Sequence, residues 1–199
     1  QLRDPAGEGT WYREDGHMSS SHLHAEGMIF IHSAPTALRD HIEWMVNAAV
    51  VAPMWQWKPQ PVCPGSWRAE VAWSGDLQQV ISLVSTLCAW RKLRFEVTVE
   101  SGALTQRWSY TPDLGVFHCA TDDAGSVRVD EVRLRTAVME SRRMGTDLAT
   151  QISDLLGEPW DVELEAYRAG DPTIDVSWFA AQVLSLIHIS EPTRLRRIS

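Results

Sequence analysis

The pair His32 and Ser33 is the part of the sequence best placed to do chemistry, because it lies where a predicted strand meets a predicted helix. Residues 28–32 form a short apolar run, and the Ser-Ala-Pro sequence that follows is typical of a helix start. Backbone N–H groups at a helix N-terminus can donate to an anion, so both side chains are candidate ligand contacts. In the alternative interpretation, Ser33 only caps the helix and His32 packs against its neighbours.

The chain contains ten tryptophans, and four of them fall within a short stretch that could line an aromatic pocket. These four are Trp55, Trp57, Trp67 and Trp73. Arg68 and Glu70 alternate with the rings of the second pair, and apolar walls with a few polar groups are typical of ligand sites. The alternative is that the rings pack in the core, as large rings mostly do. The predicted ligand-binding set is therefore His32, Ser33, Trp55, Trp57, Trp67, Arg68, Glu70 and Trp73.

Other residues that could do chemistry form no recognisable site. Cys63, Cys88 and Cys119 are odd in number and widely spaced, which predicts reduced thiols rather than disulfides. His22 and His24 lie in a predicted flexible head, and the sequence has neither a C-x-x-C pair nor a glycine-rich phosphate loop. We therefore predict no catalytic residue, no metal ion and no cofactor.

The elements that would position the candidate residues are clearest between residues 66 and 100. Residues 66–73 alternate between apolar and polar, as a strand does. Asp76 opens a helix whose apolar residues recur at helical spacing as far as Cys88, and residues 93–99 return to the strand pattern. Before this unit come a strand at 28–32, a helix ending near Val51, and a strand carrying Trp55 and Trp57.

This order predicts an α+β fold with a ferredoxin-like βαββαβ half. A C-terminal β-hairpin (106–110 and 116–120) and helices would follow it. Residues 127–129 suggest another strand, and Asp130 can cap a helix, although a longer strand from Val127 is the competing prediction. Residues 147–156 and 159–167 predict two further helices. Alternation of Ile174, Val176 and Trp178 predicts a last strand.

Composition narrows the class of protein. The 199 residues are 44% hydrophobic with a net charge of -8, which suits one domain and disfavours nucleic-acid binding. No apolar run approaches the roughly 18 residues that a membrane span needs, so we expect a cytoplasmic protein. Residues 184–194 resemble a translated sequencing-library adapter. We expect an upstream or disordered segment at 1–17, one α+β domain at 18–183 and an artefactual tail at 184–199.

Several short runs carry a resemblance to a known family. They are IFIHSAP at 29–35, WKPQP at 57–61, LRFEV at 93–97, RLR at 133–135 and LGEPW at 156–160, together with His41, Glu43 and Trp44. Over roughly residues 27–178 the chain resembles an uncharacterised actinobacterial family, domain of unknown function 3145. The resemblance implies no activity and assigns no catalytic residue.

These observations favour a non-catalytic cytoplasmic binding or regulatory module with an aromatic pocket, whose partner is a small ligand or a protein. One alternative is a small hydrolase or transferase that uses His32 with Ser33 or Arg68. A second alternative is single-stranded RNA binding, because βαββαβ is also the order of an RNA-recognition motif. Phe30 and Trp67 or Trp73 would then stack on bases, although the acidic charge argues against it.

Overall fold

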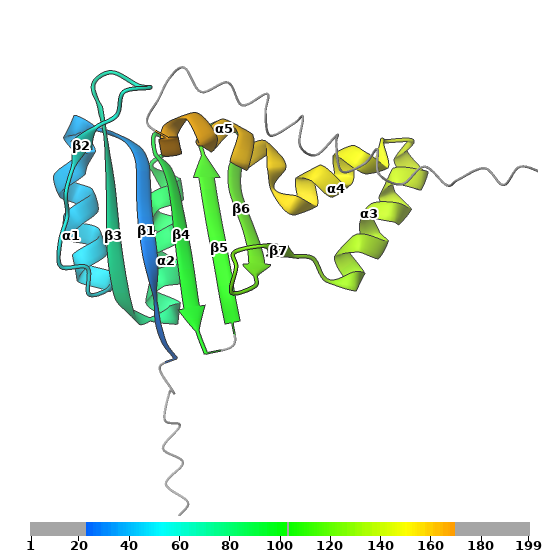
Figure 1. The fold of residues 1–199 in the computed structure, drawn as a ribbon, viewed down its shortest axis with the longest axis horizontal. Coiled ribbons are helices and arrows are strands. Elements are labelled where there is room, and N and C mark those ends of the chain that lie inside the picture. The colour runs from blue at the N-terminus through cyan, green and yellow to red at the C-terminus, as the bar shows by residue number, and fades with distance from the viewer. Residues whose placement is uncertain (1–22, 103, 170–199) are drawn as a thin grey trace, which may run out of the picture.

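The computed structural model describes residues 23–102 and 104–169 (Figure 1). In these residues an antiparallel sheet of seven strands, in the order β2-β3-β1-β4-β5-β6-β7, is combined with five α-helices. The strands are β1 (His24–Pro35), β2 (Lys58–Pro59), β3 (Ser66–Asp76), β4 (Arg94–Ser101), β5 (Leu104–Thr111), β6 (Gly115–Thr121) and β7 (Val127–Arg128). The helices are α1 (Arg39–Ala49), α2 (Leu77–Ala89), α3 (Glu131–Met144), α4 (Leu148–Leu156) and α5 (Glu158–Ala169). The fold is therefore mixed α and β, as the sequence predicts.

The main core lies between the sheet and the helices α1 and α2, which cover the same face (Figure 1). Ile29 of β1 pairs with Val71 of β3 on one side and Val97 of β4 on the other, and all three are buried. The helices contribute buried residues at helical spacing, such as Val80 and Leu87 of α2. Asp76 caps α2 by accepting from the N–H groups of residues 78 and 79, as predicted.

Strand β1 is longer than the sequence predicts, and this changes the role of Ser33. The strand continues to Pro35, which pairs with Ser66 of β3, and its register shifts between Ile31 and Ala34. A 3-10 turn over Thr36–Leu38 then precedes α1. Ser33 is a buried strand residue, so the prediction that it caps the helix is wrong. Pairing with neighbours on both sides keeps this part of the chain extended past the predicted boundary.

The strand predicted around Trp55 and Trp57 is also misplaced. Only Lys58 and Pro59 form β2, at the edge of the sheet, and both tryptophans lie before it. Proline has no N–H to donate to a ladder, which suits a very short edge strand.

The helices predicted in the C-terminal part of the chain are present. After β7 the chain forms the helix α3, so the competing prediction of a longer strand from Val127 is wrong. Asp130 caps α3 by accepting a hydrogen bond from the N–H of Arg133. Asp147 caps α4 in the same way, by accepting from the N–H of Thr150. The strand predicted at 174–178 lies outside the described residues. None of the helices in the described part of the chain has the length and apolar character to cross a membrane.

Helix α5 lies across one end of the other face of the sheet, and α4 and α3 continue beyond β6 (Figure 1). Gly157 makes the α4–α5 turn possible, because it has a left-handed φ of 79°. The ring of Phe117 on β6 lies so close to Gly157 that a Cβ there would overlap it. This turn therefore fixes the helical extension against the sheet.

We expect Gly157→Ala to lower the free energy of unfolding by about 2–4 kcal/mol, because the methyl group must displace the Phe117 ring as well as strain the backbone. Gly145 is the matched control, since it has a φ of 67° and nothing within 4 Å of the position a Cβ would take. Gly145→Ala should cost only the backbone part, about 1–2 kcal/mol. Urea denaturation compares the two variants, and equal losses would show that the Phe117 contact contributes nothing.

Candidate functional site

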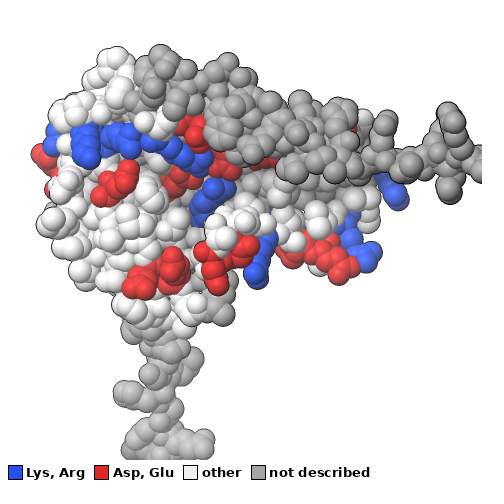
Figure 2. Space-filling view, viewed as in Figure 1, with Lys and Arg blue, Asp and Glu red and all other residues white. Residues whose placement is uncertain are grey.

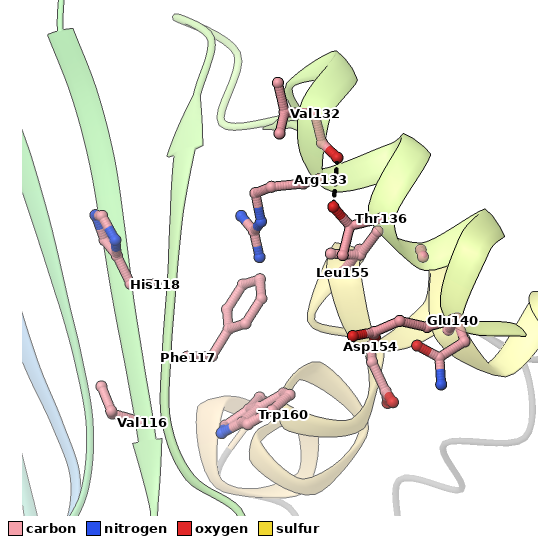
Figure 3. Close-up of a pocket in the computed structure, with 12 residues that line it drawn as sticks. Val116, Phe117, His118, Val132, Arg133, Thr136, Glu140, Asp154, Leu155 and Trp160 are labelled. Carbon is pink, nitrogen blue, oxygen red and sulfur yellow. Dashed lines mark hydrogen bonds between the residues drawn. The ribbon is translucent and has the colours of Figure 1, made fainter. Parts of the chain in front are cut away.

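A groove of about 440 Å³ lies between the outer edge of β6 and the helices α3 and α4 (Figure 3). We call it the β6 groove. Its lining comprises Val116, Phe117 and His118 of β6, Val132, Arg133, Thr136, Ala137 and Glu140 of α3, Gln151, Asp154 and Leu155 of α4, and Trp160 of α5. Strand β7 pairs only with Ala120 and Thr121, so within the described residues the outer edge of 115–119 has no neighbouring strand. Helices α3 and α4 lie beside this edge, in the position that a further strand would occupy.

Two aromatic rings form the apolar part of the β6 groove. Phe117 and Trp160 are stacked, with ring centroids 5.1 Å apart and an interplanar angle of 30°. The indole Nε1 of Trp160 donates to the carbonyl oxygen of Gly115 at 2.9 Å, which fixes the orientation of the ring. Gly157 allows the α4–α5 turn to approach the other side of Phe117. The aromatic pair is thus held in place before any ligand is present.

Arg133 supplies a positive charge next to these rings. Its backbone is fixed by the Asp130 cap, and its side chain extends from α3 toward Phe117 (Figure 3). Among the residues that the structure describes, no acceptor forms a hydrogen bond or ion pair with its guanidinium. Glu140 and Asp154, from α3 and α4, lie farther from β6 in the same view. The β6 groove therefore combines an apolar surface with a cation that is unpaired within residues 23–102 and 104–169 and, beyond it, two carboxylates.

His118 faces away from the rings. Its imidazole stacks on Trp108 at 4.4 Å and its Nε2 lies 2.8 Å from Oε1 of Gln106. Burial, and then the charge of Arg133, lower the pKa of His118 below its ordinary value. The imidazole is therefore neutral near pH 7 and adds no second positive charge to the groove.

The position of Trp160 depends on how α5 is attached to the sheet, and a buried carboxylate makes that attachment. Glu96 of β4 is only 6% exposed. Its oxygens accept hydrogen bonds from Arg168 Nη2 at 2.6 Å and Nε at 2.9 Å, and from Ser109 Oγ at 3.0 Å. His32 Nε2 lies 2.8 Å from Oε2. Burial alone would raise the pKa of Glu96, but the bonds from His32 and Arg168 outweigh it and hold the pKa well below its usual range.

A second carboxylate, on α5 itself, extends this arrangement. Asp161 accepts from Arg168 Nη2 at 2.6 Å and from both terminal nitrogens of Arg107 at 3.3 Å. Arg107 lies on β5, so the sheet and the helix each supply one arginine and one carboxylate. We call Glu96, His32, Ser109, Arg107, Asp161 and Arg168 the α5 network. In Figure 2 basic side chains form a band that runs from β3 toward the end of the sheet where α5 lies.

Further contacts hold the same helix. Arg94 Nε donates to Glu163 at 2.9 Å, and its guanidinium lies 4.7 Å from the Tyr167 ring centroid. The buried amide of Gln60 donates to the carbonyl oxygens of His32 and Tyr167. Glu163 and Glu165 are not merely solvated acids on the helix surface, because Glu163 pairs with Arg94 and Glu165 with Arg168.

The structure places His32 in the α5 network and not in an open cleft. A carboxylate and two donors do converge beside it, as an active site would require, but Arg168 and Ser109 already occupy the oxygens of Glu96. Neighbouring Ser33 is buried in β1. His32 therefore helps to join sheet and helix, whereas among the described residues Ser33 takes part only in strand pairing with Arg94.

The four predicted pocket tryptophans do not line one cavity. Trp73 is 3% exposed in the core and donates to Thr98 O. The other three are half-buried, and Trp55 stacks on Trp57. The guanidinium of Arg39 lies 5.5 Å from the Trp57 ring and 4.3 Å from the Trp67 ring. The chain's own arginine thus occupies the space beside these rings, as a cation favours aromatic faces.

Arg68 and Glu70 form a separate pair on the other face of β3, joined by a 3.2 Å hydrogen bond. Together with Met54, Gln56, Lys58 and Ala69 they line a cavity of about 300 Å³. Phe30 pairs with Glu70 in the sheet, whereas Trp67 and Trp73 follow the alternate positions of β3 and join the α1 side. Phe30 and these tryptophans therefore cannot form a single stacking platform for bases.

Comparison with known proteins gives one match. The family model described as protein of unknown function (DUF3145) matches residues 28–181. The chain belongs to this family. No curated protein and no solved structure matches. The residues matched in the DUF3145 chain include the whole β6 groove and the whole α5 network, so both lie within the family domain.

The β6 groove residues were missed by sequence reasoning. Residues 116–120 and 159–167 were predicted as strand and helix, but nothing in the sequence indicates that Phe117 and Trp160 meet. The amphipathic pattern of 148–156 signals a helix that needs an apolar partner. It does not identify that partner.

We expect Glu96→Gln to lower the free energy of unfolding at pH 7 by about 3 kcal/mol, because it removes the buried charge to which Arg168 and His32 are bonded and leaves Arg168 with the carboxylates of α5 alone. Since the folded pKa of Glu96 is depressed, its contribution is complete above its unfolded pKa, about 4.3, and is lost as pH falls below that value. As the pH is lowered from 5 through about 4.3, the free energy of unfolding should therefore fall less in the variant than in the wild type, as measured by urea denaturation.

Glu70→Gln is the control for this experiment. Glu70 also pairs with an arginine, but its side chain is exposed, so its loss should change stability by less than about 0.5 kcal/mol. A Glu96→Gln variant as stable as Glu70→Gln at pH 7 would contradict the proposed role of the α5 network.

Proposed function

We propose that this protein is a non-catalytic cytoplasmic binding or regulatory module, and that its ligand site is the β6 groove. The observation that carries the proposal is the guanidinium of Arg133, which has no partner among the described residues, beside the stacked pair of Phe117 and Trp160. A concave apolar surface with a few polar groups is the usual form of a ligand site, and about 440 Å³ is within the ordinary size range. The proposed site lies at Phe117 and Trp160, and not at Trp55, Trp57, Trp67 and Trp73, where the sequence predicts an aromatic pocket.

The ligand class follows from the chemistry of the walls. A guanidinium binds a carboxylate, sulfonate or phosphate through charge-assisted hydrogen bonds. The half-buried Trp160 ring, which Phe117 supports from behind, offers the surface for a flat apolar group. Glu140 and Asp154 can accept from donors at the other end of the ligand. We therefore propose a small molecule, or a side chain of a protein partner, that combines an aromatic group with an acid.

Two features of the fold support the rest of the proposal. The order β2-β3-β1-β4, with α1 and α2 on one face, supports a ferredoxin-like half in which β5, β6 and β7 extend the sheet. Cys63, Cys88 and Cys119 are free thiols, which supports a reducing compartment such as the cytoplasm. Burial raises the pKa of the Cys88 and Cys119 thiols, so neither is a ready nucleophile.

The two alternatives have less support. A hydrolase or transferase using His32 would need access to an imidazole that is buried and bonded to Glu96. Binding of single-stranded RNA would need stacking rings on one face and a basic surface, whereas Phe30 and Trp73 lie on opposite faces and the net charge is -8.

The proposal can be tested with 1-anilinonaphthalene-8-sulfonate, a fluorescent probe that joins flat rings to an anion. We expect saturable binding at one site, weakened roughly tenfold or more by Arg133→Gln, since a charge-assisted hydrogen bond is worth about 1.5–3 kcal/mol. Phe117→Leu should weaken binding as well, because it removes the buried ring that holds Trp160 in place.

Arg143→Gln is the matched control, because Arg143 is an exposed arginine of α3 that does not line the β6 groove. It should leave probe affinity unchanged. Equal affinity of Arg133→Gln and wild type would place the probe elsewhere and remove the support for this site.

A further inference from the structure

Helix α3 has a second face that the β6 groove does not use. Only Ala137 of this helix is buried, and in Figure 1 α3 is the helix farthest from α1 and α2. The face away from the groove exposes Leu134 and Met139, with Val138 half-buried between them, and the Met139 side chain is 63% exposed. Isolated apolar residues on a surface are ordinary, but an aligned group on one helix indicates a contact surface.

The charges that flank these apolar residues are arranged symmetrically. Glu131 lies one turn before Leu134, Arg142 lies one turn after Met139, and Arg135 lies between. From Glu131 to Arg142 is about three helical turns, so all six side chains share one face. We call Glu131, Leu134, Arg135, Val138, Met139 and Arg142 the α3 stripe. Charged side chains of both signs gather over α3 in Figure 2.

The α3 stripe is complementary to itself when two copies run antiparallel. A two-fold axis at the midpoint between residues 136 and 137 places Glu131 opposite Arg142 of the second copy, and Leu134 opposite Met139. The same axis places Val138 opposite the aliphatic stem of Arg135, which can cover apolar surface. Each opposite-charge contact occurs twice, as an isologous interface requires.

We propose that two copies of this protein associate through antiparallel pairing of their α3 stripes. Charge complementarity favours a second copy over another occupant, because Arg142 has no ionic partner among the described residues and Glu131 bonds only to Arg135 of its own helix. One helix per copy buries less than the roughly 800 Å² per partner of a standard stable interface, so the dimer is weak and concentration-dependent. The β6 groove, on the other face of α3, stays open in this dimer.

Sedimentation velocity of the full chain over a range of concentrations tests the proposal with two charge reversals. Glu131→Lys places Lys opposite Arg142, and Arg142→Glu places Glu opposite Glu131, so each variant alone should dimerise at least roughly tenfold more weakly than wild type. Mixed together, the two variants regain an opposite charge at both contacts. The mixture should therefore form a heterodimer of near wild-type affinity.

Arg143→Glu is the control, because it makes the same reversal on α3 outside the stripe and should leave dimerisation unchanged. Circular dichroism of each variant checks that α3 is still folded. A wild-type chain that stays monomeric up to about millimolar concentration would overturn the proposal and leave the α3 stripe to another segment or partner. A dimer that both reversals leave intact, or variants that do not associate when mixed, would overturn it too.

Discussion

The buried carboxylate of Glu96 is the constraint on which the arrangement of this protein depends. One face of the sheet is covered by α1 and α2 through apolar side chains, but Glu96 places a negative charge on the opposite face. A charge removed from water must be compensated by partners of fixed geometry. Arg168 provides two hydrogen bonds to it from α5, with Asp161 and Arg107 completing the arrangement. The two sides of the sheet are therefore held by different forces.

The ionic attachment of α5 determines the geometry of the β6 groove. Trp160 belongs to the first turn of α5, and Gly157 immediately precedes that helix. Once Asp161 and Arg168 are bonded to the sheet, the Trp160 ring meets Phe117 and the α4–α5 turn closes against the same ring. Helix α3 then reaches the groove through its contact with α4. The wall that carries Arg133 is the part of the groove least tied to the sheet, because its helix buries only Ala137.

Local patterns in the sequence predict the elements but not their contacts. Alternation in 66–73 and helical spacing in 77–88 predict β3 and α2, because each pattern reports one element's own buried face. Ser33 could not be placed correctly, since strand pairing on both sides overrides the local signal for a helix start. The Trp57 and Trp67 rings looked like an empty pocket because nothing in the sequence places Arg39 between them. The α5 network joins Glu96 to Arg168 across 72 positions, a separation that no pattern in one sequence can indicate.

The two edges of the sheet bear on whether molecules of this protein can add strands to one another. Within the described residues the sheet ends in β2 and β7, strands of two residues each, and Pro59 of β2 lacks an N–H to offer. Long unpaired edges act as templates for strand addition between molecules, which leads to open-ended fibrous aggregation. Strands β2 and β7 each present few backbone groups, and the part of β6 that β7 leaves unpaired, residues 115–119, faces α3 and α4 across the β6 groove. Growth through backbone pairing is thereby discouraged at the two terminal strands, whereas contacts through side chains, which can close on themselves, need no free strand edge.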